Sequence, residues 1–214
     1  MAISLLTSCA KERYLRSDIK KFIASFSISE AFEKYKDCSF TRVDTETIGD
    51  NVVEVTAVKS INKLDPENLQ YDYTEITTEN GEVKQSLHNY LEKNGEKYYY
   101  VSGDSVVEKT ASEALEIVDS FFYTSSSEGI YIGGMYAGDT MRDIIYDIQD
   151  NVTIDSENKL LVYSYEKVMK EGNLTVTITQ NYKVNDIGMA VSNYIQKVSS
   201  QSTFTTVLTV TNNQ

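Results

Sequence analysis

The stretch Leu174-Thr-Val-Thr-Ile-Thr-Gln-Asn-Tyr-Lys-Val184 decides the fold, because two kinds of side chain alternate along it. The odd positions carry Thr, Asn or Lys, whereas the even positions other than Gln180 carry aliphatic or aromatic side chains. Successive side chains of a β-strand point to opposite faces of a sheet. The period of two therefore predicts a strand with one buried face.

The same pattern extends in both directions as a run of four strands between Asn158 and Asn212. Short polar turns separate these strands: Glu171-Gly172-Asn173, then Asn185-Asp186, then a serine cluster at 199–202. Connections this short force antiparallel neighbours, because a parallel crossover needs about a dozen residues or more. We expect the four strands at 159–168, 173–184, 187–198 and 203–211.

An amphipathic helix precedes the first strand. Apolar residues recur at helical spacing from Ser17 to Tyr35, and the spacing slips near Ser25. Ser27 followed by Glu30 has the form of a capping box. The segment is therefore expected to form a helix in two pieces, the second starting at Ser27.

Five further strands are expected between this helix and the middle of the chain. Asn80-Gly81 and Asn94-Gly95 are the dipeptides that type I′ hairpin turns prefer, and alternating residues flank both. The chain's only proline, Pro66, lies in the turn before the third of these strands. The five strands are predicted at 39–47, 52–61, 68–77, 83–92 and 97–101.

The middle of the chain is predicted to hold two helices. Thr110 and Glu113 form a second capping-box pattern, and an apolar stripe follows it. Another amphipathic helix is expected to start near Asp139 or Thr140, with a short strand at 152–154 after it. The two stripes comprise Ala114, Leu115, Val118, Phe121 and Phe122, and then Met141, Ile144, Ile145 and Ile148.

Segregated strands and helices predict an α+β fold with one long antiparallel sheet of about nine strands. A chain of 214 residues with 41% hydrophobic content is long enough for one well-buried domain, which we expect to span 17–214. The clean alternation in 174–184 predicts that Ile178→Lys is severely destabilising, whereas Thr177→Lys should cost little.

The charge balance excludes several classes of partner. The chain has 20 basic and 32 acidic residues, a formal charge of -12, which repels the phosphate backbone of nucleic acids. The same charge disfavours adsorption on anionic lipid through a basic patch. No apolar run reaches the 18 residues that suggest a transmembrane helix. Attachment to a membrane would therefore have to be covalent or hydrophobic.

The N-terminus resembles the lipobox of bacterial lipoproteins, in which a small residue precedes a cysteine that is acylated. Leu6-Thr7-Ser8-Cys9 matches it, although only about five apolar residues and no basic ones come before it. The resemblance implies a truncated signal peptide and tether at 1–16 and a palmitate-type anchor on Cys9. It also implies a location on the extracytoplasmic face of the bacterial cell membrane. Alternatively, Cys9 sits in a disordered terminus or pairs with Cys38, which otherwise reads as a buried, inert thiol.

The order of elements resembles the half-barrel of the lipoprotein carrier LolA and of other lipid-carrying envelope lipoproteins. In that family a curved sheet wraps around helices that plug its mouth, and an apolar cavity holds acyl chains. The resemblance implies that the central helices are the plug. The implied ligand-binding residues, facing one another across a gap, are Tyr71, Tyr73, Leu115, Phe122, Met141, Ile145 and Val176. The alternative is that these residues form ordinary core.

No pattern indicates catalysis, a metal or a cofactor. His88 is the only histidine and alternates with Leu87 along a strand, without a nucleophile elbow in the sequence. One histidine and two distant cysteines match no zinc spacing. Asp139, Asp143 and Asp147 are best interpreted as a solvated acidic helix face. The segment 133–138 is glycine-rich but lacks the Lys and Ser/Thr of a phosphate-binding loop.

We therefore expect a monomeric, lipid-anchored, non-enzymatic lipoprotein of the cell envelope that binds or carries a lipid or acyl chain. The alternative is a protein or polymer interaction module that uses the outer face of the sheet. Pocket shape discriminates between them. A deep apolar cavity favours the carrier, and a filled core with an exposed aromatic patch favours the interaction module.

Overall fold

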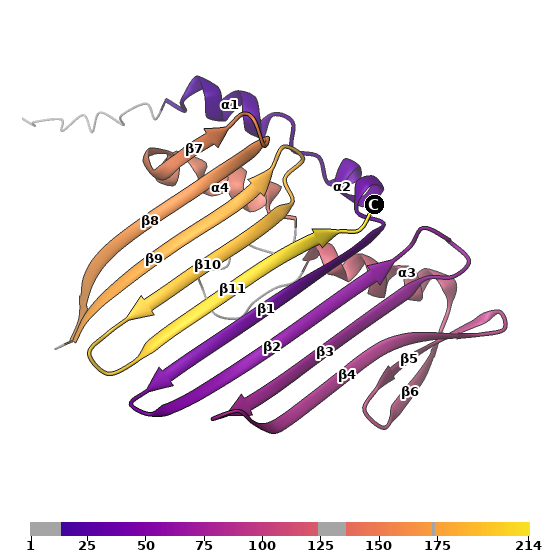
Figure 1. Ribbon diagram of the computed structural model, residues 1–214. Helices are drawn as coiled ribbons and strands as arrows, with labels where there is room; N and C mark the ends of the chain where they lie inside the picture. The colour runs from indigo at the N-terminus through magenta and orange to yellow at the C-terminus, as the bar shows by residue number, and fades with distance from the viewer. Residues whose placement is uncertain (1–13, 124–135, 173) are drawn as a thin grey trace, which may run out of the picture.

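The computed structural model describes residues 14–123, 136–172 and 174–214, and Figure 1 shows their arrangement. The expectations for Cys9 and its lipobox, for positions 133–135 of the glycine-rich segment, and for the side chains of Asp139 and Asp143 lie outside the described residues.

In the described part of the chain, eleven strands form one antiparallel sheet. Its order is β6-β5-β4-β3-β2-β1-β11-β10-β9-β8-β7. The strands are β1 (Asp37–Ile48), β2 (Asn51–Asn62), β3 (Gln70–Glu79), β4 (Glu82–Asn94), β5 (Lys97–Ser102), β6 (Ser105–Lys109), β7 (Val152–Asp155), β8 (Leu160–Glu171), β9 (Leu174–Asn185), β10 (Ala190–Val198) and β11 (Thr203–Asn212).

Two meanders make up this sheet, and they meet where the first strand pairs with the last. β1 pairs with β11 in a register that runs from Cys38 opposite Asn212 to Thr47 opposite Thr203. The four-strand meander β8 to β11 confirms the prediction from alternation and short turns. The expected short strand is also present as β7.

The described helices are α1 (Ser17–Ile23), α2 (Ile28–Lys34), α3 (Ala111–Asp119) and α4 (Gly138–Ile148), with 3-10 turns η1 (Ser120–Tyr123) and η2 (Gln149–Asn151). The capping box at α3 is confirmed. Thr110 Oγ1 accepts from the Glu113 amide at 3.3 Å, and Glu113 Oε2 accepts from the Thr110 amide at 2.8 Å. At α2, Ser27 caps as expected, but Glu30 forms an ion pair with Lys34 at 2.6 Å.

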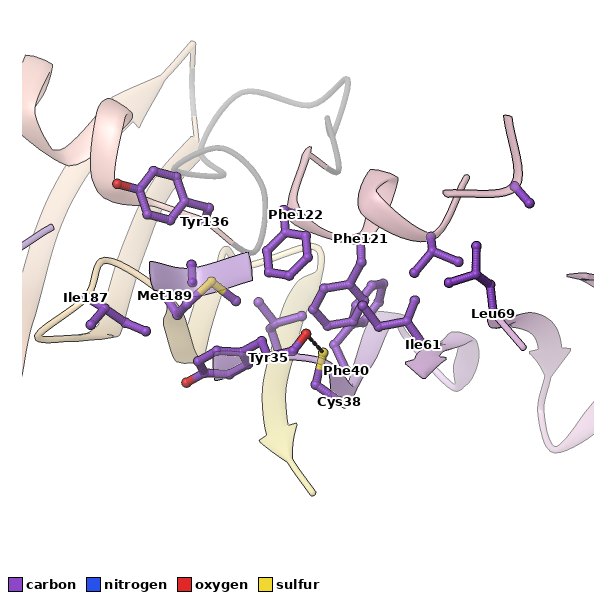
Figure 2. Close-up of a cluster of buried hydrophobic side chains, with 14 of the residues drawn as sticks. Tyr35, Cys38, Phe40, Ile61, Leu69, Phe121, Phe122, Tyr136, Ile187 and Met189 are labelled. Atoms are coloured by element: carbon purple, nitrogen blue, oxygen red, sulfur yellow. Dashed lines mark hydrogen bonds between the residues drawn. The ribbon is translucent and has the colours of Figure 1, made fainter. Parts of the chain in front are cut away.

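The core consists of two clusters that lie side by side under the helices. The first cluster joins α2, α3 and η1 to the sheet through residues such as Phe40, Ile61, Phe121 and Phe122, and Figure 2 shows how these side chains converge. Cys38 lies in it as a free, buried thiol, and its Sγ donates to the Tyr35 carbonyl at 3.6 Å. Its burial is as predicted, and burial raises the pKa of this thiol to about 12, so the thiol is protonated at physiological pH.

The second cluster joins α1 and α4 to strands β7 to β10. Ile19, Met141, Ile145 and Val184 are fully buried in it. Arg16 fixes the start of α1 to the same region, because its Nη1 donates to the Val152 carbonyl at 2.8 Å. α1 also contacts the edge strand β7, which protects that edge from pairing with other chains.

Three expectations about the fold need correction. The sheet has two strands more than the nine expected among the described residues, and β6 is the one that no pattern predicted. Leu115 does not face the sheet, because 42% of it is exposed on the outer side of α3. Ile178 is only partly buried, because the helices do not extend over that part of β9.

Candidate ligand-binding face

One face of the sheet carries the helices, and they lie at one end of it (Figure 1). This helix-side face includes Cys38, Phe40, Arg42, Asp44 and Glu46 of β1 and their register partners on neighbouring strands. We call the end with the two core clusters the covered end. The opposite end, which reaches the β1–β2 and β10–β11 hairpins, is the open end.

Apolar side chains continue along the helix-side face into the open end. Val53 and Phe204 both pair with Glu46, and Ile178 pairs with Lys197 next to Phe204. These three apolar side chains are partly buried. The apolar alternation of β9 and β11 thus runs past the helices.

A polar strip crosses the helix-side face between the two ends. It consists of Tyr73, Glu75, Arg42, Asp44, Thr206, Gln180 and Asn193. Arg42 Nε lies 2.9 Å from Asp44 Oδ2, and Thr206 Oγ1 donates to Asp44 Oδ1 at 2.8 Å. Thr206 is fully buried. Breaking the hydrogen bond between a buried hydroxyl and a carboxylate is costly, because both groups would lose their partner. The Thr206–Asp44 hydrogen bond therefore holds this part of the strip in one arrangement.

The small side chain of Ala57 lets the strip bridge two strands that are not neighbours. Ala57 pairs with Arg42 on one side and with Glu75 on the other, and the Arg42 guanidinium reaches to 4.0 Å from Glu75. Tyr73 donates to Glu75 Oε2 at 2.5 Å. Burial, followed by this hydrogen bond, raises the pKa of Tyr73 to about 12, so it is a neutral donor at physiological pH.

The remaining members of the strip are amides on the other side of β11. Gln180 Nε2 donates to Asn193 Oδ1 at 3.3 Å, and both side chains are buried. Next to them, Tyr182 is 1% exposed, and its hydroxyl has no hydrogen-bond partner within the described residues. Burial raises the pKa of Tyr182.

Lys59 lies where the strip meets the covered end, and it is 5% exposed. Its ammonium donates to Ser120 Oγ at 3.2 Å and lies 5.3 Å from the centroid of the Tyr71 ring. No carboxylate pairs with it in the part of the chain that the structure describes. Burial lowers the pKa of Lys59 to about 8. The neighbouring Lys63, by contrast, forms an ion pair with Asp119 at 2.7 Å.

The structure separates the residues that the LolA resemblance brought together. Phe122 is fully buried in the first cluster, and Met141 and Ile145 are fully buried in the second. Tyr71 packs against the first cluster, Tyr73 belongs to the polar strip, and Val176 is buried near the open end of β9. Leu115 points away from the sheet. These residues therefore do not face one another across a single gap.

Three of the pockets that described residues line each mix charged and apolar groups. One of about 710 Å³ lies beside the β2–β3 turn and includes Asp72 and Leu69. One of about 420 Å³ lies between Phe22 of α1 and Ile154 of β7. The third, of about 340 Å³, lies between α3 and the sheet and is floored by Tyr71 and Tyr100.

The sequence holds a signal for the polar strip and for Lys59, although neither matches a catalytic motif. Arg42 and Asp44 continue the same alternate positions as the apolar Phe40, and Lys59 lies between Ala57 and Ile61 in the same way. A charge in the apolar phase of a strand must face the core side of the sheet. Such residues are candidates for function, because burying an unpaired charge is costly.

The described residues offer neither a candidate metal-ion cluster nor a candidate membrane-spanning helix. They contain no cluster of three or more His, Cys, Asp or Glu side chains that could hold a metal ion. None of the described helices is both long enough and apolar enough to cross a membrane.

No protein-family model and no curated protein sequence matches this chain. The chain is similar in structure to LprF from Mycobacterium bovis, with 15% identity, 92% of this chain and 93% of that chain covered, and a TM-score of 0.34. It is also similar to a β-barrel-like protein with a domain of unknown function from Brucella abortus, with 7% identity, coverage of 83% and 97%, and a TM-score of 0.23. At these TM-scores neither protein indicates what this chain binds.

Proposed function

We propose that the protein is a non-catalytic carrier or binding protein for a lipid or other amphiphile with an acyl chain, and that the chain lies on the open end of the helix-side face. One observation carries this proposal: Val53, Ile178 and Phe204 are partly buried apolar side chains beyond the helices, with Lys197 and Glu46 between them on the same face. Each methylene buried there contributes about 0.8 kcal/mol, so a short contact along the face gives useful affinity.

Because of the polar strip, the helix-side face has apolar side chains at the open end and charged and hydrogen-bonding groups beside them. An acyl chain on the open end would lie with one end near Arg42, Asp44 and Glu75, which present both charges and hydrogen-bonding groups. A purely apolar ligand would gain nothing from that arrangement, whereas an amphiphile would. We also propose that the sheet and its helices form a LolA-like half-barrel. It is supported by an open, curved antiparallel sheet with helices at one end (Figure 1).

Two adjacent residues of β9 test the proposal. Ile178 lies on the helix-side face and Thr177 on the outer face, and both are partly buried. Ile178→Glu places a carboxylate on the proposed chain path, between Lys167 and Lys197, which can pair with it. It should lower affinity for dansyl-undecanoic acid, followed by fluorescence, about tenfold or more. Thr177→Glu is the matched control and should bind like the parent. Equal binding by both variants, or no binding by the folded parent, would refute the proposal.

We also propose that the domain is tethered to the extracytoplasmic face of the membrane through an acylated Cys9. The support is the lipobox-like Leu6-Thr7-Ser8-Cys9 sequence. The described chain starts near α1, where Arg16 binds the domain, so a tether would leave the molecule at the β7 edge. Mass spectrometry of the native protein should show a diacylglyceryl-type mass addition on Cys9. An intact Met1 with an unmodified Cys9 would refute the anchor.

The outer face favours a second candidate, a protein or polymer interaction module. Threonines face one another across β1 and β11, with Thr41 opposite Thr209 and Thr45 opposite Thr205. This leaves a broad hydroxyl-rich surface on that side of the sheet. Failure of the folded parent to bind the dansyl probe would favour this alternative.

A further inference from the structure

The pocket beneath α3 has an aromatic floor, and the buried ammonium group of Lys59 lies directly behind its lining residues. Tyr71 and Tyr100 line the pocket with their ring centroids 6.2 Å apart, and Ile117 and Ser120 line it from the helix side. Lys59 contacts two of these residues, because its Nζ donates to Ser120 Oγ at 3.2 Å and lies over the Tyr71 ring. A volume of about 340 Å³ is enough for a compact small molecule.

The ammonium of Lys59 is not satisfied by its surroundings. It has three N–H donors, and its only hydrogen bond among the described residues is the one to Ser120. A buried charge is normally paired, because desolvation costs several kcal/mol that a partner must offset. Lys63, four residues further along the chain, follows that rule through Asp119. Lys59 is the exception, and it lies beside a pocket.

From this geometry we propose that the pocket beneath α3 binds a compact arylalkyl carboxylate, whose carboxylate accepts a hydrogen bond from Lys59 beside Ser120 and whose ring packs on Tyr71 and Tyr100. This site is separate from the open end and does not depend on the acyl-chain proposal. Lys59 supplies the charge-assisted hydrogen bond and Tyr71 and Tyr100 supply the apolar surface.

The carboxylate is favoured over a larger anion by the walls of the pocket. Glu113 and Glu116 also line it, and both are exposed on α3. Lys109 is the one basic side chain among the lining residues, and it pairs with Glu113. A doubly charged group such as a phosphate would be repelled by these two carboxylates more strongly than a single negative charge. Glu113 is held in the capping box and by Lys109 at 3.7 Å, so it is not available to neutralise Lys59.

The test compares 3-phenylpropionate with 3-phenyl-1-propanol, which have similar shape and differ in charge. The parent protein should bind the carboxylate about tenfold to a hundredfold more tightly than the alcohol, as measured by calorimetry. Lys59→Met replaces the ammonium with an apolar side chain of similar length. It should abolish the preference for the carboxylate and leave the affinity for the alcohol unchanged.

Lys63→Met is the matched control. It removes a lysine that already has a carboxylate partner, so it should keep the preference for 3-phenylpropionate. No carboxylate binding by the folded parent, or an undiminished preference in Lys59→Met, would overturn the proposal. If Lys59→Met fails to fold, the proposal is tested instead by NMR titration of the parent protein with 3-phenylpropionate. The Tyr71 and Ser120 amides should shift saturably with 3-phenylpropionate, and unchanged amide positions would likewise overturn it.

Discussion

The covered and open ends of the helix-side face are built from the same strands, yet they differ in what lies over them. On β9, Val184 is fully buried beneath α4 and its neighbours, while Ile178 on the same face is only partly buried. Burial differs in the same way between two phenylalanines: Phe122 on the η1 turn is fully buried, whereas Phe204 on β11 is only partly buried. Apolar side chains on the same face are therefore fully covered in the two clusters but only partly covered at Ile178 and Phe204.

The largest expected effect separates the two ends of β9. Val184→Glu buries a carboxylate without a partner in the second cluster and should lower the free energy of unfolding by about 4 kcal/mol or more. Ile178→Glu lies between Lys167 and Lys197 and should cost roughly 1 kcal/mol. Urea unfolding of both variants measures the difference, and equal losses would show that the open end is packed like the covered end.

Truncating one phenylalanine at each end is the next test. Phe122 is fully buried, and its ring packs edge-on against the ring of Phe32 with the two centroids 4.6 Å apart. Phe122→Ala should therefore lower the free energy of unfolding by about 3 to 5 kcal/mol. Phe204→Ala should cost about 1 kcal/mol, because part of its surface is already exposed. Only Phe204→Ala should weaken binding of the dansyl probe directly. A reversed order of the melting temperatures would contradict the assignment of the ends.

Lys59 marks the boundary between the ends, and its titration gives a pH signature. Burial lowers its pKa from an ordinary 10.5 to about 8, so the unfolded chain holds more protons than the folded one between those values. The contribution of Lys59 to the free energy of unfolding should therefore rise through this window by about 1.4 kcal/mol for each pH unit. Lys59→Met should be more stable than the parent at pH 7, and this advantage should shrink by about 1 kcal/mol between pH 8 and 9.

The difference in stability between the parent and Lys59→Met reports the titration of Lys59 alone. Cys38 and Tyr73, whose pKa values burial raises to about 12, make both proteins less stable at high pH and cancel in the difference. Chemical unfolding of the parent and of Lys59→Met at pH 7, 8 and 9 supplies the measurement. A constant difference across this range would show that Lys59 is hydrated rather than buried.

The smallest expected effect concerns the side of helix α3 that faces away from the sheet. Leu115 is 42% exposed on α3, so Leu115→Gln should change the free energy of unfolding by less than about 0.5 kcal/mol. Val118 lies on the buried side of the same helix, and Val118→Gln should lower the melting temperature clearly. A large loss of stability in Leu115→Gln would show that Leu115 packs against the sheet, as the LolA resemblance implied.

Local patterns in the sequence determined most of the elements of this fold. Alternation and short turns predicted strands β8 to β11 and the apolar phase of β9, and the capping box at Thr110 and Glu113 predicted the start of α3. β6 escaped notice because it is five residues long and exposed on nearly every side chain, so it has no buried face to create a pattern. Its turn at Gly103-Asp104 was the available signal.

Only the tertiary structure decided how far the helices reach along the sheet and which charges they leave beside it. Alternation reports which way a side chain points and is identical for Val184 and Ile178, because it depends on the strand alone. Burial depends on what packs above that face, which contacts between distant segments settle. The pairing of β1 with β11, the meeting of Arg42 with Glu75 over Ala57, and the approach of Lys59 to Ser120 are such contacts.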